Sequence, residues 1–97
     1  MNYWIHPEAE QELSDAALFY AATASKEIAL AFLHEFGRVR DLLVWNQDLG
    51  TELAQGMRVF HLQKFPYGVI YFKDDAGPQI YAVCHHRRKP GYWTSRI

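Results

Sequence analysis

The sequence predicts an α+β fold in which an antiparallel helix hairpin packs on one face of an antiparallel sheet. The chain has 97 residues, of which 49% are hydrophobic and 15% aromatic, which suffices for one core and not for two. We therefore expect a single domain over residues 1–97. Apolar residues in the first half recur at helical spacing, and the second half is rich in aromatic and β-branched residues between turn signals. The expected order is strand, helix, helix, and a three-stranded meander.

A short strand over residues 2–6 and a helix beginning at Pro7 are predicted first. Proline suits the first helical position because its missing N–H needs no partner there, which leaves His6 at the cap. Three glutamates then favour the positive end of the helix dipole and indicate a helix start rather than a catalytic set: Glu8, Glu10 and Glu12. One face of this helix is apolar, with Ala9, Leu13, Ala16 and Tyr20.

The helical pattern breaks over residues 21–24, and a second helix is predicted after it, with the hydroxyl of Thr23 or Ser25 as its N-cap. The short connection between the two helices indicates an antiparallel hairpin. Residues 46–56 are polar and contain glycine, so we expect a loop there. The predicted buried stripe of the second helix consists of Ile28, Ala31, Phe32, Phe36, Val39 and Leu43.

Three strands are predicted over residues 57–64, 67–73 and 79–85. Phe65-Pro66 separates the first two, and the run Asp74-Asp75-Ala76-Gly77-Pro78 separates the last two. Links this short favour an antiparallel meander. The helices would then cover one face of the sheet.

The net charge of −1 conceals an uneven distribution along the chain. Residues 1–55 carry nine acidic and three basic side chains, whereas residues 56–97 carry two acidic and seven basic ones. Such asymmetry hints at a polyanionic partner. On the first meander strand, Arg58 and Lys64 share one face and could bind phosphate, or could be ordinary solvated cations. The alternation on this strand does not reveal which face meets the core.

The densest cluster of functional side chains is residues 85–93, with the sequence HHRRKPGYW. Cations neutralise phosphate, aromatic rings stack on unpaired bases, and histidine transfers protons near neutral pH. The alternative is an exposed tail whose Tyr92 and Trp93 pack back on the core. Because adjacent strand residues point to opposite faces, His85 and His86 cannot both serve one role.

Other site classes are disfavoured by the sequence. The five histidines lack metal-binding spacing, so we expect neither a metal nor another cofactor. The single cysteine, Cys84, excludes an internal disulfide and lies in an apolar run typical of a buried small residue. No secretion signal and no apolar stretch of membrane-spanning length is present. We therefore expect a cytoplasmic protein without a membrane partner.

The segment FPYGVIYF at residues 65–72, together with HHRRKPGYW at residues 85–93, resembles the RelE/ParE toxin superfamily, and its ParE branch in particular. The opening strand, the run Pro7-Glu8-Ala9-Glu10 and the helix hairpin are similar too, so that the resemblance covers roughly residues 3–93. It implies the toxin of a bacterial type II toxin–antitoxin module, held inactive by a cognate antitoxin. DNA would be reached only indirectly, through the antitoxin.

Two activities are implied by this resemblance. A ParE-like toxin inhibits DNA gyrase and is not an enzyme; its contact surface here would be Arg87, Arg88, Lys89, Tyr92 and Trp93. A RelE-like toxin enters the ribosome and cleaves mRNA without metal, which requires activating a 2′-OH, stabilising charge and protonating the leaving oxygen. In that case the candidate residues are Arg58, Lys64, His85, Arg87, Arg88 and Tyr92. The acidic first half favours the gyrase inhibitor, and the density of His and Arg keeps the endonuclease as the alternative.

Overall fold

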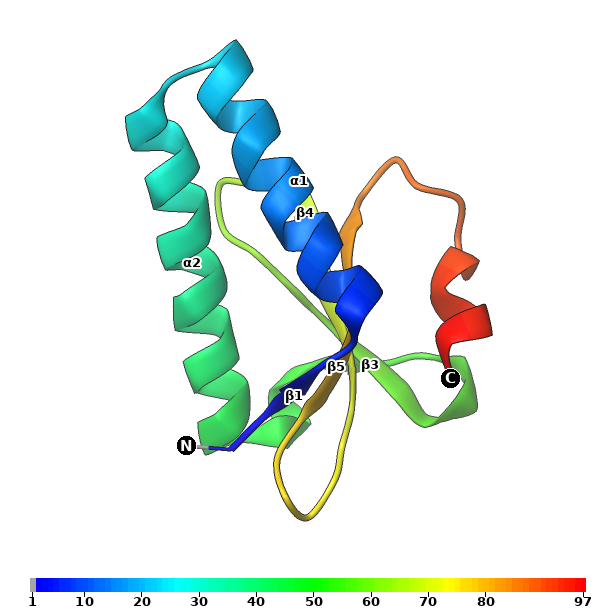
Figure 1. The fold of residues 1–97 in the computed structure, drawn as a ribbon. Coiled ribbons are helices and arrows are strands. Elements are labelled where there is room, and N and C mark those ends of the chain that lie inside the picture. Colours follow the sequence, from blue (N-terminus) through cyan, green and yellow to red (C-terminus); the bar gives the residue numbers. More distant parts are fainter. Residues whose placement is uncertain (1) are drawn as a thin grey trace.

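A helix hairpin lies against one face of a five-stranded sheet, and the C-terminal segment lies against the other face (Figure 1). This computed structural model describes residues 2–97. The hairpin consists of α1 (Pro7–Thr23) and α2 (Lys26–Trp45). The α+β class and the placement of the hairpin are therefore as the sequence predicts.

Both helices begin at the caps that the sequence indicates. The His6 Nδ1 accepts a hydrogen bond from the amide of Glu8 at 3.0 Å, and the Ser25 hydroxyl accepts one from the amide of Ile28 at 3.1 Å. Each cap satisfies an N–H that has no partner within its helix. The amides of Ala24 and Ser25 both bond to the Tyr20 carbonyl, which closes the hairpin without a glycine or proline.

The sheet is mixed, in the order β1-β5-β4-β3-β2. The meander strands β3 (Met57–His61), β4 (Tyr67–Phe72) and β5 (Gln79–His85) are antiparallel, as expected. The predicted strand over residues 57–64 ends earlier, at His61, because the chain turns at Lys64, where φ is 67°.

Two very short edge strands complete the sheet. The N-terminal strand is confined to β1 (Trp4–Ile5) and pairs in parallel with β5. The predicted loop over residues 46–56 contains β2 (Thr51–Glu52), which pairs with β3, and two 3-10 turns. The local sequence predicts a strand at β1 but not at β2, which forms through its pairing with β3.

The core lies on both faces of the sheet. Beneath the helices, Phe32 and Val39 pack with Tyr71 and Ile80, and all four side chains are fully buried. Phe60 of β3 and Leu62, which follows the strand, also pack with this cluster beneath the helices. The predicted buried stripe is wrong at Ile28 and Ala31, which are exposed. The face of α2 that meets the core in its first turns includes Ala29 and Phe32 instead.

On the opposite face, a smaller cluster packs around Trp93, with Met57, Ile70 and Ala82. Trp93 belongs to a C-terminal 3-10 segment, η3 (Tyr92–Arg96), which the residue pattern does not predict. Trp93 is 7% exposed, so the C-terminal segment covers part of this face and leaves the rest open.

A buried tyrosine fixes the loop before the meander. The Tyr71 hydroxyl donates to the Gln47 carbonyl at 2.7 Å and accepts from the Gly50 amide at 2.9 Å. A Cβ at position 50 would lie 2.4 Å from that hydroxyl oxygen, so only glycine allows this approach. The loop is thereby held against the β3 edge.

Candidate functional site

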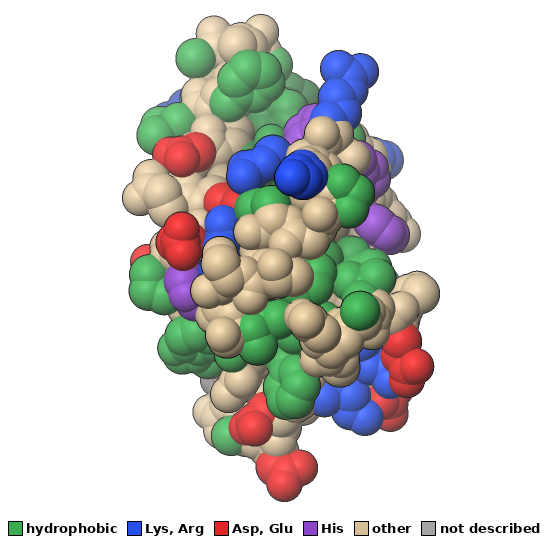
Figure 2. All heavy atoms as spheres, turned by 90° about the vertical axis from the view of Figure 1, so that its right-hand side faces the viewer, with side chains coloured by type: hydrophobic (Ala, Val, Ile, Leu, Met, Phe, Trp, Pro, Cys, Tyr) green, Lys and Arg blue, Asp and Glu red, His purple; other side chains and the backbone are tan. Residues whose placement is uncertain are grey.

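The loop after β5 presents the cations that the sequence singled out. Arg87, Arg88 and Lys89 are all exposed. The loop turns tightly, because the Arg88 amide bonds to the His85 carbonyl and the Arg87 amide bonds to the His85 Nδ1, both at 3.0 Å. Figure 2 shows Lys and Arg side chains gathered beside histidines at one end of the open face.

Behind the loop, Glu12 of α1 connects it to the C-terminal segment. Its carboxylate accepts from the Tyr92 hydroxyl at 2.6 Å, from two nitrogens of Arg96 at 2.8 and 3.0 Å, and from the Val83 amide at 3.0 Å. The Arg88 guanidinium lies 3.8 Å from the centre of the Tyr92 ring and 3.8 Å from the Glu12 carboxylate. Arg88 is therefore the cation of the loop that is fixed to the fold.

The electrostatics of this cluster hold Glu12 ionised. Burial acts to raise the pKa of the Glu12 carboxyl, but the hydrogen bonds from Arg96, Tyr92 and Val83 outweigh it and leave the pKa below its ordinary value. Burial and the bond to Glu12 raise the pKa of the Tyr92 phenol far above its ordinary value. The Tyr92 proton therefore stays on the phenol at any physiological pH.

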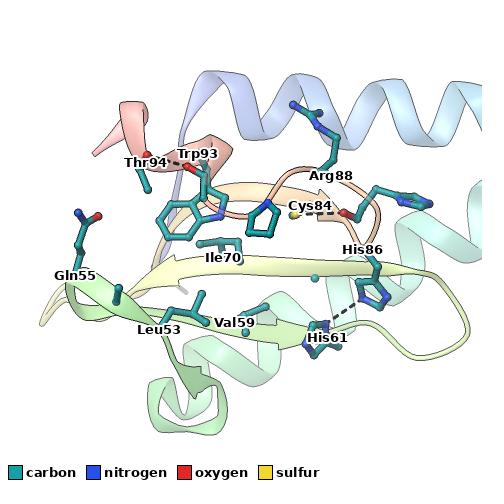
Figure 3. A pocket seen from close by; sticks show the side chains of 15 residues that line it. Leu53, Gln55, Val59, His61, Ile70, Cys84, His86, Arg88, Trp93 and Thr94 are labelled. Carbon is teal, nitrogen blue, oxygen red and sulfur yellow. Dashed lines mark hydrogen bonds between the residues drawn. The ribbon is translucent and has the colours of Figure 1, made fainter.

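A groove of about 910 Å³ lies on the open face of the sheet, beside the cationic loop (Figure 3). Its floor and walls are mainly apolar: Leu53, Val59, Ile70, Cys84 and Trp93 line it. Burial raises the pKa of the Cys84 thiol, which keeps this half-buried cysteine protonated and a poor nucleophile.

A histidine pair closes one end of the groove. His61 Nδ1 and His86 Nε2 are 3.1 Å apart, and the two rings meet edge to face. A Cβ at Gly68, on the neighbouring strand, would lie 3.0 Å from the His61 Nδ1, so glycine is what leaves room for the pair. Burial and then the neighbouring His86 lower the pKa of the His61 imidazole.

The comparisons with known proteins agree with this fold. Residues 3–90 match the family profile described as ParE toxin of the type II toxin–antitoxin system, parDE. The chain belongs to the ParE toxin family. The resemblance to the ParE branch that the sequence indicated is thereby confirmed.

Among solved structures, this ParE-family chain is similar to a chain of the chromosomal ParDE toxin–antitoxin system from P. aeruginosa. The TM-score is 0.75 at 20% sequence identity, and the alignment covers 88% of this chain and 95% of that one. An identity this low shows a shared fold. The search among curated proteins finds no match.

The endonuclease candidates of this ParE-family chain do not all lie together. Arg58 pairs across the sheet with Tyr71, and its guanidinium bonds to the Gly50 carbonyl at 2.8 Å and to Glu52 at 3.0 Å. Lys64 lies in the turn between β3 and β4, at the sheet end where His85 is found. The His85 ring packs edge to face on Tyr67. Arg58 thus holds the β2 region, away from the cationic loop.

The two adjacent histidines have different partners, although both line the groove. His85, the last residue of β5, packs on Tyr67, whereas His86, in the turn that follows, pairs with His61. His61, Glu12 and Arg96 were not among the predicted site residues. Their partners lie 25 to 84 residues away in the sequence, so local spacing carries no signal for them.

Two negative findings bound the site. Within residues 2–97, no group of three or more His, Cys, Asp or Glu side chains is arranged to hold a metal ion. No described helix is both long and apolar enough to cross a membrane.

Proposed function

We propose that this ParE-family chain is the toxin of a bacterial type II toxin–antitoxin module, acts in the cytoplasm by binding DNA gyrase, and is neutralised by a cognate antitoxin. The observation that carries the proposal is the family match over residues 3–90. The proposal treats residues 1–97 as one toxin domain that touches DNA only indirectly, through the antitoxin.

The contact surface is proposed to be the cationic loop. Arg87 and Lys89 are exposed, and within residues 2–97 neither the Arg87 guanidinium nor the Lys89 ammonium forms an ion pair or hydrogen bond, so both can reach an acidic patch on a partner. Tyr92 supports this surface, since the Arg88 guanidinium stacks on its ring, and Trp93 packs against Ile70 and Ala82 of the sheet and so fixes the segment that holds Tyr92. We assign them to loop positioning and Arg87, Arg88 and Lys89 to direct contact.

A protein target explains the site better than RNA cleavage does. General acid–base catalysis needs proton donors and acceptors that converge on the reacting atoms. Here the Tyr92 hydroxyl donates its hydrogen bond to Glu12, the Arg58 guanidinium bonds to Glu52 of β2, and the His85 ring packs on Tyr67. The ribosome-dependent mRNA endonuclease therefore remains the competing outcome that an assay must separate.

The test compares two activities of the purified chain. We expect it to inhibit negative supercoiling by gyrase and to leave mRNA intact in a translation extract. Arg87→Ala with Lys89→Ala should weaken supercoiling inhibition, whereas Lys26→Ala, which removes an exposed cation at the hairpin tip, should not. Cleaved mRNA with undisturbed gyrase would replace this proposal with the endonuclease.

A further inference from the structure

The His61–His86 pair at the end of the groove has the geometry of a two-ligand chelate. The His61 Nδ1 and the His86 Nε2 lie 3.1 Å apart, and the two rings meet edge to face. Two imidazole nitrogens that bind one ion at about 2.0–2.1 Å lie about 2.9–3.4 Å from each other at right-angled to tetrahedral geometry. The observed separation falls within that range, so rotation of the rings is enough for one ion to bind both.

The backbone fixes the two imidazoles on either side of β4. His61 ends β3 and pairs with Gly68 of β4. The His86 amide bonds to the Pro66 carbonyl, just before that strand, at 2.9 Å. Figure 3 shows the two rings facing each other across the strand, at Gly68, where a Cβ would lie 3.0 Å from the His61 Nδ1. Ligands that are held in place before binding lose little conformational entropy when the ion arrives.

We propose that His61 and His86 form an exchangeable binding site for Zn²⁺ or a related divalent transition-metal ion, held by the His61 Nδ1 and the His86 Nε2, with water at its remaining positions. Histidine spacing does not predict this site, because the two residues are 25 positions apart and only folding brings them together. The inference goes beyond the proposed function and depends on neither gyrase nor the antitoxin.

The donor set selects the class of ion. Imidazole nitrogens bind Zn²⁺, Cu²⁺ and Ni²⁺, whereas Mg²⁺ and Ca²⁺ prefer oxygen ligands. No Asp or Glu side chain lines the groove within residues 2–97, so a hard cation finds no carboxylate there. Two other donors of the groove are already engaged: the Cys84 thiol donates to the His85 carbonyl, and the His85 Nδ1 accepts from the Arg87 amide.

A site with two protein ligands differs from a closed structural zinc site. Structural zinc sites use four protein ligands and stabilise the fold, whereas open sites keep positions for water. Both rings are exposed, so an ion can enter and leave directly from solvent. We therefore expect reversible binding to a chain that is folded without the ion. The alternative is a plain N–H···N hydrogen bond between two neutral imidazoles that binds no ion.

The experiment is an NMR titration of the untagged chain with ZnCl₂, followed through the ring nitrogens of its histidines, with MgCl₂ as the control ion. We expect saturation at one Zn²⁺ per chain, with shifts of the His61 Nδ1 and His86 Nε2 signals that exceed those of the other histidine rings. Mg²⁺ should shift neither signal. Saturation at half an ion per chain would mean that two copies share the ion, and would overturn the chelate.

Single variants keep the test independent of folding. His86→Gln, in an exposed turn, should weaken Zn²⁺ binding about a hundredfold, because the second ring of a chelate binds intramolecularly, and should leave the circular dichroism spectrum unchanged. His34→Gln is the matched control, since it removes an exposed histidine of α2, and it should leave binding unchanged.

Three results would overturn the proposal: no saturable Zn²⁺ binding by the wild type, binding that leaves the two ring nitrogens unshifted, or equal weakening by His34→Gln and His86→Gln. Because gyrase takes no part in this titration, its result and that of the supercoiling assay are independent.

Discussion

Replacing Glu12 with glutamine tests whether the C-terminal segment and the cationic loop depend on one carboxylate. The Glu12 side chain is 15% exposed and the Arg96 side chain 8%, so the ion pair is largely shielded from water. Glutamine keeps the shape but removes the nearer carboxylate, so that Arg96 keeps only Glu8, at 3.7 Å, as a charged partner. Removing one member of a fully buried pair costs about 3–5 kcal/mol. For this partly exposed pair we expect a loss of about 2–4 kcal/mol in the free energy of unfolding.

The assay is urea denaturation followed by circular dichroism, with hydrogen exchange of the amides in residues 92–97. Glu10→Gln is the matched control, because Glu10 is an exposed glutamate on the same helix, and it should change stability by less than about 0.5 kcal/mol. The reasoning is refuted if both variants lose the same stability, or if η3 keeps its protection in Glu12→Gln.

The same carboxylate predicts a pH dependence of stability. The pKa of Glu12 is lower in the folded chain than in the unfolded chain, so the unfolded state binds more protons between those two pKa values. The contribution of Glu12 is therefore complete above the unfolded pKa and is lost as the pH falls through the folded one. Wild type should lose this increment in acid, and Glu12→Gln should not.

Three further predictions concern the core and the thiol. Phe32→Ala should lower the free energy of unfolding, measured by urea denaturation, by about 3–5 kcal/mol. The ring is fully buried, and its centre lies 5.2–5.4 Å from those of Tyr20, Phe65 and Tyr67. Unchanged stability would mean that α2 presents another face to the core. Tyr71→Phe should lower the free energy of unfolding by about 1–3 kcal/mol, because the two hydrogen bonds of the Tyr71 hydroxyl are lost. An unchanged free energy of unfolding would show that water replaces those two bonds. Cys84 should react with iodoacetamide at pH 8 more slowly than in the urea-unfolded chain, because burial raises the pKa of its thiol; equal rates would contradict that burial.

The helices and the meander could be predicted because local chemistry specifies them. His6 and Ser25 supply cap acceptors at fixed distances along the chain, and the turn residues around Pro66 and Pro78 divide the strands. The family could also be named from the sequence, since its most specific motifs are contiguous. The exposure of Arg87 and Lys89 follows from their place in a polar loop.

Tertiary structure decided the rest, because the deciding contacts join residues far apart in the sequence. The strand Thr51–Glu52 exists through pairing with Arg58 and Val59. Glu12, expected only to start a helix, anchors Arg96 at the other end of the chain. Pairings of this kind depend on which face of the sheet each side chain meets, a choice that the alternation in β3 left open.

The charge asymmetry between the halves of the chain also separates what the sequence determines from what the tertiary structure decides. The sequence by itself determined how many cations the second half carries. Folding decided which of them are available to a partner: Arg96 and Arg58 are held by carboxylates, Arg88 is stacked on Tyr92, and Arg87 and Lys89 extend into solvent. The physical reason is that a charge is neutralised by what lies near it in space, and only the tertiary structure sets that distance.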